Sequence, residues 1–311
     1  MNLVIAFAEL VAGFVLLIKG ADFFVDGSSA IARRFHVPTL IIGMTIVAMG
    51  TSLPELSVSV AASIQGNNSL SVSNVTGSDL FNIMVALGAC AIVCDLEVTA
   101  DVLKRDFPFY ILSTVVLLAT GLINRELSRV DGIILLVLFV VFLGMMIRSA
   151  RLSDDEESEG EKSLSLILSL VFIIGGAAAI KLGGDWVVSG AVEIARACGV
   201  TETLIGLTIV AFGTSLPEFV TALVAARKNE LDMAIGNVLG SNIFNILLIL
   251  GVASALSPIP FIRENIIDMA VLLIVSIIVW IFSITKRVIN RWEGLVMVAM
   301  YGAYLIYIIK R

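Results

Sequence analysis

The chain contains two copies of one segment, and this duplication constrains its fold more than any other feature. Residues 22–83 align without a gap onto residues 185–246, at a constant offset of 163 residues. Within them GMTIVAMGTSLPE (43–55) matches GLTIVAFGTSLPE (206–218) at 11 of 13 positions, and NVTGSDLFNI (74–83) matches NVLGSNIFNI (237–246) at 7 of 10. Two such blocks at one offset indicate that the two halves of the chain share one fold.

Both copies lie in long apolar runs. The chain is 59% hydrophobic and only 15% charged, whereas soluble domains carry about 25% charged residues. Too few polar residues remain to cover a water-facing surface, which excludes a soluble enzyme or a nucleic-acid-binding protein. A bilayer-spanning helix takes roughly 20 apolar residues. The sequence therefore predicts an all-α membrane protein with about ten transmembrane helices, at 3–25, 38–64, 70–93, 107–124, 130–148, 164–188, 201–227, 232–256, 266–285 and 293–309.

The number of spans in each copy predicts how the copies are oriented. We assign five helices to residues 1–148 and five to residues 163–311, joined by an acidic linker at 149–162, SARLSDDEESEGEK. Five is odd, so the second copy enters the membrane inverted, and such repeats hold their site between them near the midplane. Lys and Arg number 12 on the linker side and 6 on the other. The positive-inside rule then predicts a protein of the cell membrane with a cytoplasmic linker and both termini outside.

The first repeated motif, GTSLPE, interrupts a hydrophobic run. Pro54 and Pro217 lack an N–H and clash with the carbonyl four residues earlier, so each is expected to break its helix. A break at membrane depth is tolerated only where it faces protein or a water-filled cavity. The expected oxygen donors are the carbonyls of Ala48, Thr51, Ala211 and Thr214, the hydroxyls of Ser52 and Ser215, and the carboxylates of Glu55 and Glu218.

The second motif supplies further oxygens. Ser78 and Asn82 are four residues apart, as are Ser241 and Asn245, so each pair shares one helix face. Gly77 and Gly240 permit close helix approach. An oxygen-only ligand set suits Ca²⁺ or Na⁺ rather than zinc or copper. We expect these ions to be cargo and expect no resident cofactor.

The charge of this site predicts a mechanism. Two buried carboxylates repel each other and are costly without compensation. The empty site carries −2, which one Ca²⁺, two protons or two Na⁺ would neutralise, and three Na⁺ would leave +1. A site that crosses the membrane only when loaded exchanges cations, so antiport is the hypothesis.

The paired GTSLPE and GS(D/N)xFN motifs resemble the α-repeats of the sodium/calcium exchangers, within the calcium/cation antiporter superfamily. The resemblance implies a secondary active antiporter that exchanges Ca²⁺ for Na⁺ by alternating access, with the first helix of each repeat sliding across the core. It implies that Glu55 and Glu218 bind Ca²⁺ with the carbonyls of Thr51 and Thr214. It also implies Na⁺ sites that use Ser52, Ser78, Ser215, Ser241, Ala48 and Ala211.

Two departures from the family pattern leave the coupling ion open. Many relatives carry an aspartate at one of the positions held here by Asn82 and Asn245, and Asp79 stands where the other copy has Asn242. We expect Asp79 to lie beside the site rather than in it. An antiporter of H⁺ and Ca²⁺, or of another divalent cation, remains the alternative on the same scaffold. An intramembrane protease is disfavoured because its Gly-x-Gly-Asp motif is absent, and inverted duplication disfavours a channel. The sequence predicts no enzyme and does not predict an oligomeric state.

Overall fold

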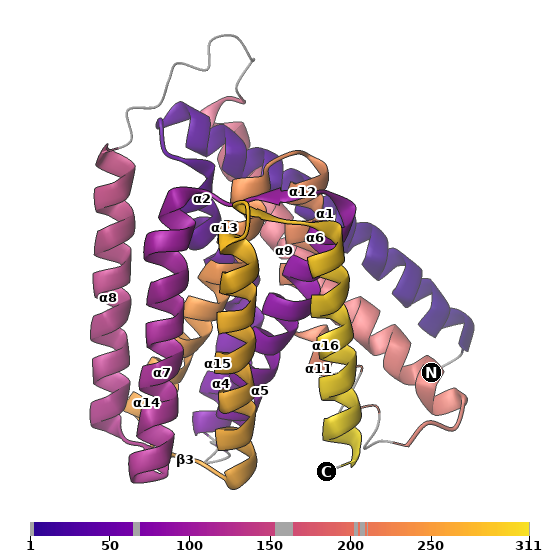
Figure 1. The fold of residues 1–311 in the computed structure, drawn as a ribbon. Helices are drawn as coiled ribbons and strands as arrows, with labels where there is room; N and C mark the ends of the chain where they lie inside the picture. The colour runs from indigo at the N-terminus through magenta and orange to yellow at the C-terminus, as the bar shows by residue number, and fades with distance from the viewer. Residues whose placement is uncertain are drawn as a thin grey trace.

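The computed structural model describes residues 3–64, 69–152, 164–201, 205, 209 and 211–310, and these form a helical bundle (Figure 1). Within these ranges eight helices are long and apolar enough to cross a membrane, and there are nine if the pair Thr39–Thr51 and Leu53–Ala61, bent by 46°, is counted as one broken span. The remaining predicted span, 201–227, includes residues 202–204, 206–208 and 210, which lie outside the described residues. The all-α membrane fold that the sequence predicts is confirmed.

The first half comprises α1 (Leu3–Arg34), α2 (Thr39–Ile42), η1 (Gly43–Val47), α3 (Ala48–Thr51), α4 (Leu53–Ile64), α5 (Ser69–Phe81), η2 (Asn82–Ala86), α6 (Leu87–Val93), β1 (Leu96–Glu97), η3 (Val102–Asp106), α7 (Phe107–Asn124), β2 (Glu126–Leu127) and α8 (Arg129–Leu152). The second half comprises α9 (Leu166–Ala197), α11 (Ala211–Gly213), α12 (Leu216–Arg227), α13 (Leu231–Phe244), η5 (Asn245–Ile249), α14 (Leu250–Leu256), β3 (Ile259–Pro260), α15 (Arg263–Ile284), β4 (Val288–Ile289) and α16 (Arg291–Lys310).

Helices α1 and α9 are longer than the sequence predicts. Each has 32 residues, whereas the expected spans were 3–25 and 164–188. Both run obliquely to the upright helices α7, α8, α15 and α16 (Figure 1). A tilted helix needs more residues to cross the same thickness, and hydropathy alone does not reveal tilt.

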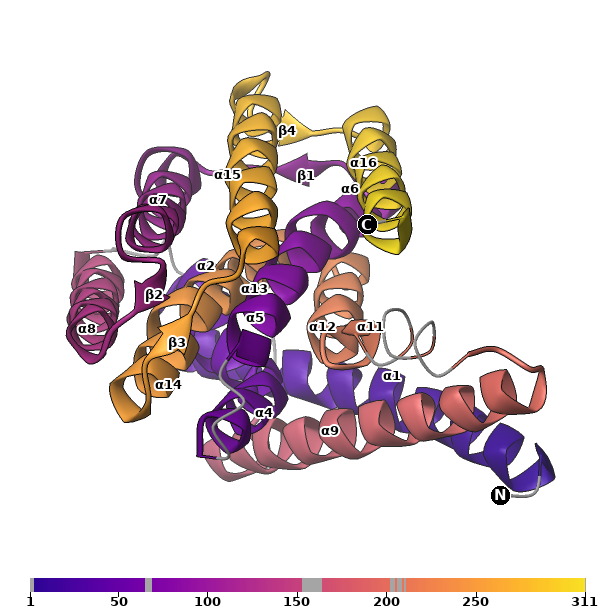
Figure 2. The ribbon, with the colours of Figure 1, turned by 90° about the horizontal axis from the view of Figure 1, so that it is seen from below.

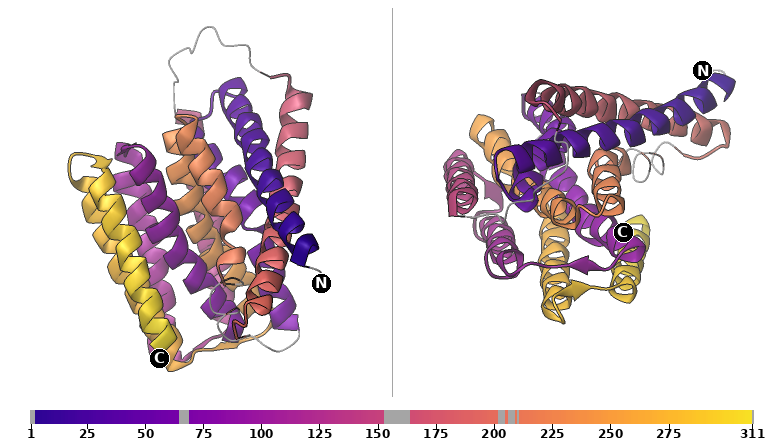
Figure 3. Two further views of the ribbon diagram at one scale, coloured as in Figure 1. Left: turned by 90° about the vertical axis from the view of Figure 1, so that its right-hand side faces the viewer. Right: turned by 90° about the horizontal axis from the view of Figure 1, so that it is seen from above.

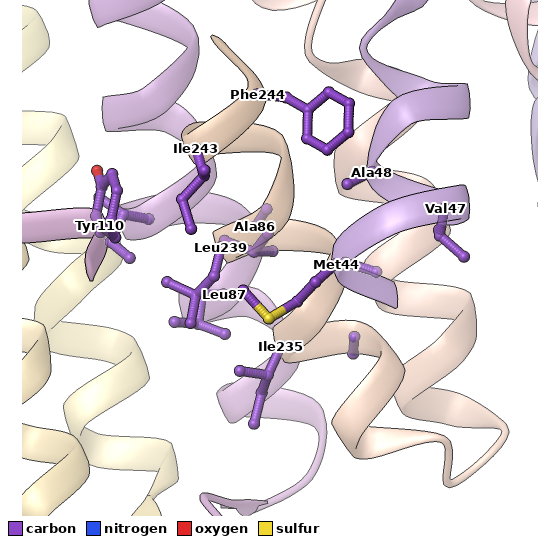
Figure 4. Close-up of a cluster of buried hydrophobic side chains, with 14 of the residues drawn as sticks. Met44, Val47, Ala48, Ala86, Leu87, Tyr110, Ile235, Leu239, Ile243 and Phe244 are labelled. Atoms are coloured by element: carbon purple, nitrogen blue, oxygen red, sulfur yellow. The ribbon is translucent and has the colours of Figure 1, made fainter. Parts of the chain in front are cut away.

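The bundle has three layers. Helices α1 and α9 lie side by side across one face, α5, α12 and α13 occupy the centre, and α7, α8, α15 and α16 cover the far side (Figures 2 and 3). Residues 233–250 are buried except Leu248, as expected for the central helix α13 and its continuation η5. The core around it is apolar, with Met44 pointing toward Leu87 and Leu239 and with Phe244 beside Ala48 (Figure 4).

The contacts between α1 and α9 relate the two copies by an approximate two-fold axis. A methyl group placed on Gly13 would lie 2.8 Å from the Gly183 carbonyl oxygen, and one on Gly20 would lie 3.0 Å from that of Gly176. At the offset of 163, Gly13 corresponds to Gly176 and Gly20 to Gly183. Exchanging the two copies therefore turns the Gly13–Gly183 contact into the Gly176–Gly20 contact. The helices are antiparallel, because positions that rise along α1 fall along α9.

Two short antiparallel ladders repeat this symmetry away from the long helices. Leu96 of β1 pairs with Ile289 of β4, and Leu127 of β2 pairs with Ile259 of β3. Each ladder joins a strand of one copy to a strand of the other. The sequence did not predict these two-residue strands, because a two-residue strand has no measurable periodicity.

Candidate ion-binding site

Both Pro-Glu motifs interrupt their helices, as predicted. In the first copy α3 ends at Thr51, Ser52 has φ −84° and ψ 4°, and α4 begins at Leu53. In the second copy α11 ends at Gly213 and α12 begins at Leu216. The expectation of a freed carbonyl at Ala48 is wrong in this conformation, because that oxygen still accepts the Ser52 N–H at 3.0 Å. Pro54 removes the bond to the Gly50 carbonyl, and the bond two residues earlier stays intact.

The two glutamates of these motifs are buried between the copies. Glu55 and Glu218 are both 0% exposed. Ser52 of the first copy donates to Oε1 of Glu218 in the second at 2.9 Å. The other oxygen of Glu218, and both oxygens of Glu55, have no hydrogen-bond partner among the described residues. Buried carboxylates without a partner are costly, so these oxygens are suited to a cation.

Thr51 connects the first break to the second copy. Its hydroxyl lies 3.3 Å from Asn237 Oδ1 and 3.5 Å from Ser241 Oγ, both on α13. Asn237 in turn donates to the Glu218 backbone carbonyl at 3.1 Å. The corresponding hydroxyls of the opposite pair, Thr214 and Ser78, are buried and unpartnered among the described residues. The two halves of the site therefore differ in this conformation.

The amides of the second motif meet across the two-fold axis. Asn82 Nδ2 donates to Asn242 Oδ1 at 3.1 Å, and Asn245 Nδ2 donates to Asp79 Oδ1 at 2.9 Å. Asn242 Nδ2 also donates to the Tyr110 hydroxyl and to the Asp79 backbone carbonyl. All four side chains are buried, so they form one polar layer inside an apolar core.

Several buried acceptor oxygens of the candidate site have no hydrogen-bond partner among the described residues. Among the predicted site residues these atoms are Oε1 and Oε2 of Glu55, Oε2 of Glu218, Oγ of Ser78, Oγ of Ser215, Oγ1 of Thr214, Oδ1 of Asn82 and Oδ1 of Asn245. Buried polar atoms normally have partners, and a cluster of oxygen acceptors is what a hard cation requires. No group of three or more His, Cys, Asp or Glu side chains forms a metal cage within the described ranges, so the candidate ligand set is two carboxylates with neutral oxygens.

The remaining predicted residues have simpler positions. Ala48 is buried on α3. Ala211 begins α11, but its side chain lies outside the described residues. Sequence reasoning missed Asn237, although it lies in the second motif, and Tyr110, which belongs to no motif and whose role appears only when α7 packs against α13.

A cavity of about 380 Å³ lies beside the breaks. Pro54, Pro217 and Thr214 line it, together with Lys181 and Asp185 of α9. Lys181 and Asp185 form an ion pair of 2.7 Å. The cavity therefore connects an exposed, charged stretch of α9 with one residue of the candidate site, Thr214.

Comparisons with known proteins agree over nearly the whole chain. Residues 5–148 and 168–310 match the family model described as sodium/calcium exchanger protein. An uncharacterized membrane protein of Methanocaldococcus jannaschii is 37% identical over 96% of both chains. The sodium/calcium exchanger MaX1 of Methanosarcina acetivorans is 32% identical, covering 96% of this chain and 97% of its own length. A structure of the sodium-calcium exchanger NCX_Mj, soaked with zero Na⁺ and Ca²⁺, superposes with a TM-score of 0.87 at 35% identity, over 98% of this chain and 99% of that one.

Proposed function

Because the chain belongs to the sodium/calcium exchanger family and is thus a membrane antiporter of Ca²⁺, we propose that Na⁺ is the ion it exchanges for Ca²⁺. The proposed site consists of the twelve residues that the sequence motifs single out: Ala48, Thr51, Ser52, Glu55, Ser78, Asn82, Ala211, Thr214, Ser215, Glu218, Ser241 and Asn245. Glu55 and Glu218 bind Ca²⁺ with the carbonyls of Thr51 and Thr214 and the amide oxygens of Asn82 and Asn245, and the hydroxyls and alanine carbonyls complete the Na⁺ sites. A carbonyl oxygen has two lone pairs, so the Ala48 carbonyl can accept the Ser52 N–H and still contact an ion.

The observation that carries this proposal is the surplus of neutral oxygens around the two acids. Proton coupling requires only that Glu55 and Glu218 exchange Ca²⁺ for protons. One Ca²⁺ takes about six to eight oxygens, which the two carboxylates, the two threonine carbonyls and the two amides can supply. The unpartnered hydroxyls of Ser78, Ser215 and Thr214 are surplus to that set. Several Na⁺ ions would use them, since each needs a shell of oxygens.

The relatives support the same choice of ion. MaX1, which this chain matches over nearly its full length, is named a sodium/calcium exchanger. NCX_Mj has been studied with Na⁺, Ca²⁺ and Sr²⁺, in work on extracellular ion exchange and binding-site occlusion. Alternating access around a site between inverted repeats is the corresponding proposal for this chain.

Ion flux in proteoliposomes tests the coupling ion. A tenfold outward Na⁺ gradient provides about 1.4 kcal/mol per ion, and we expect it to drive Ca²⁺ uptake at fixed pH. A protonophore that removes any pH gradient should leave this uptake intact. Empty liposomes and Na⁺-free vesicles are the controls. Uptake that follows a pH gradient and ignores Na⁺ would instead establish the proton-coupled alternative.

The orientation in the membrane is also a proposal, with residues 1–148 and 163–311 as the inverted halves. The first turn of α1 and the last turn of α16 lie toward the end of the bundle opposite the last turn of α8 and the first turn of α9 (Figure 1). Together with the Lys/Arg bias this supports a cytoplasmic 149–162 linker.

Cysteine labelling tests this orientation. In a variant without the native cysteines, Gly160→Cys should react with a membrane-impermeant maleimide only in inside-out vesicles or opened cells. Gly160 lies outside the described residues, so the prediction rests on the sequence. A cysteine added after Arg311 is the matched probe and should label in intact cells. Labelling of Gly160→Cys in intact cells would reverse the orientation.

A further inference from the structure

Asp79 is the D/N position of the second motif, and the proposed ligand set does not use it. It is 0% exposed, and its Oδ1 accepts the Asn245 amide at 2.9 Å. Its equivalent in the other copy, Asn242, accepts the Asn82 amide at 3.1 Å. Each copy therefore uses the residue after its second-motif serine to hold the amide of the opposite copy.

These two bonds determine which end of each amide remains for an ion. An asparagine can present either its carbonyl or its NH₂, and its partners decide which. Asn82 and Asn245 both direct Nδ2 at the holding residue, and the Oδ1 of each is buried and unpartnered among the described residues. A cation can use only the carbonyl end, so this orientation is the productive one.

The two holding residues act by different means. Asn242 turns its Oδ1 toward Asn82 because its own Nδ2 donates to the Tyr110 hydroxyl at 3.1 Å and to the Asp79 backbone carbonyl at 3.2 Å. Asp79 needs no such support, because its Oδ1 is a carboxyl oxygen that accepts the Asn245 N–H directly at 2.9 Å.

We propose that Asp79 is a positioning residue of the ion site, which fixes the Asn245 amide so that its carbonyl oxygen faces the transported cation. In this proposal Asp79 acts through Asn245 rather than as a ligand, although its own Oδ2 is also buried and unpartnered among the described residues. The proposal rests on the proposed function only in placing Asn245 at the site, and it holds for either coupling ion.

Equilibrium Ca²⁺ binding tests the proposal without reference to coupling. A ligand that binds the folded state stabilises it by RT ln(1 + [L]/Kd), so the Kd obtained from the rise in melting temperature with Ca²⁺ concentration is the readout. Asp79→Leu should raise this Kd by about tenfold, because it removes the hydrogen bond that holds the Asn245 amide. Asp79→Asn, whose carbonyl can still accept from Asn245, should lie between Asp79→Leu and wild type. Ser283→Ala, which removes a buried hydroxyl bonded to the Val279 carbonyl, controls for general loosening of the core.

A donor–acceptor exchange separates positioning from a merely structural role. Asn245→Asp alone places two carboxylates face to face and should weaken Ca²⁺ binding. The double variant Asp79→Asn/Asn245→Asp restores a donor opposite an acceptor, and it should bind Ca²⁺ more tightly than Asn245→Asp alone. Wild-type Ca²⁺ binding by folded Asp79→Leu, or a double variant no better than Asn245→Asp, would overturn the proposal. Failure of Na⁺ to drive uptake by wild type would instead overturn the coupling ion and leave the role of Asp79 standing.

Discussion

Glu55→Gln and Glu218→Gln are each expected to abolish Ca²⁺ transport while leaving a folded protein in the membrane. Glutamine keeps the volume of the side chain and one acceptor oxygen but removes the charge. Ca²⁺ in the variant site would retain an uncompensated positive charge in a buried environment, which costs several kcal/mol. Since each 1.4 kcal/mol is tenfold, Ca²⁺ uptake should fall by at least about a hundredfold.

The same substitutions should not reduce stability in the absence of ions. Both carboxylates are fully buried, and Glu55 has no hydrogen-bond partner among the described residues, so removing its charge removes a desolvation penalty. The Glu55→Gln protein should therefore melt at or above the wild-type temperature without Ca²⁺, and Ca²⁺ should no longer raise that temperature.

Glu126→Gln, at an exposed acid in β2, is the matched control and should transport normally. Near-wild-type uptake by either site variant, at equal expression, would remove that glutamate from the site. A variant that fails to reach the membrane would show that the carboxylate has a structural role that its burial does not reveal.

The fold could be predicted from the sequence because its main constraints are periodic and duplicated. Long apolar runs predict the membrane spans, and the odd number of spans in each copy predicts that the second copy is inverted. The equivalent contacts Gly13–Gly183 and Gly20–Gly176, which run antiparallel, agree with this inversion. The lengths of α1 and α9 could not be predicted, because their tilt is decided by how these glycines pack.

The content of the candidate site was predictable, but its asymmetry was not. Repetition singles out Glu55, Glu218 and the second-motif amides in the sequence. It predicts equivalent surroundings for both copies, whereas Ser52 reaches Glu218 and no described residue bonds the Glu55 carboxylate. Which copy packs more closely depends on the conformation of the whole bundle, and a sequence specifies both conformations of an alternating transporter.

Gly240→Val is expected to separate the first break from the central helix and to eliminate both Ca²⁺ transport and much of the stability. A Cβ at Gly240 would lie 2.7 Å from the Cα and carbonyl oxygen of Met44 and 2.8 Å from Ala48 Cβ. These are backbone and Cβ atoms, which cannot move away by a change of side-chain rotamer. Overpacking of this kind costs about 1–3 kcal/mol or more, and relief requires α13 to move away from η1 and α3.

That movement would act on the site through Thr51. Its contacts with Asn237 and Ser241 of α13, at 3.3 and 3.5 Å, exist only because Gly240 lets the two backbones touch, as small residues do between membrane helices. Melting temperature and Ca²⁺ uptake of the purified protein should therefore fall together in Gly240→Val, with Gly240→Ala between it and wild type. Gly144→Val introduces the same side chain on an exposed face of α8, where a Cβ meets no described atom within 4 Å, and it should leave both quantities unchanged. Normal transport by Gly240→Val would mean that the motifs of the two copies need not touch for the exchanger to work, and the site would then have to be assembled differently from the arrangement described above.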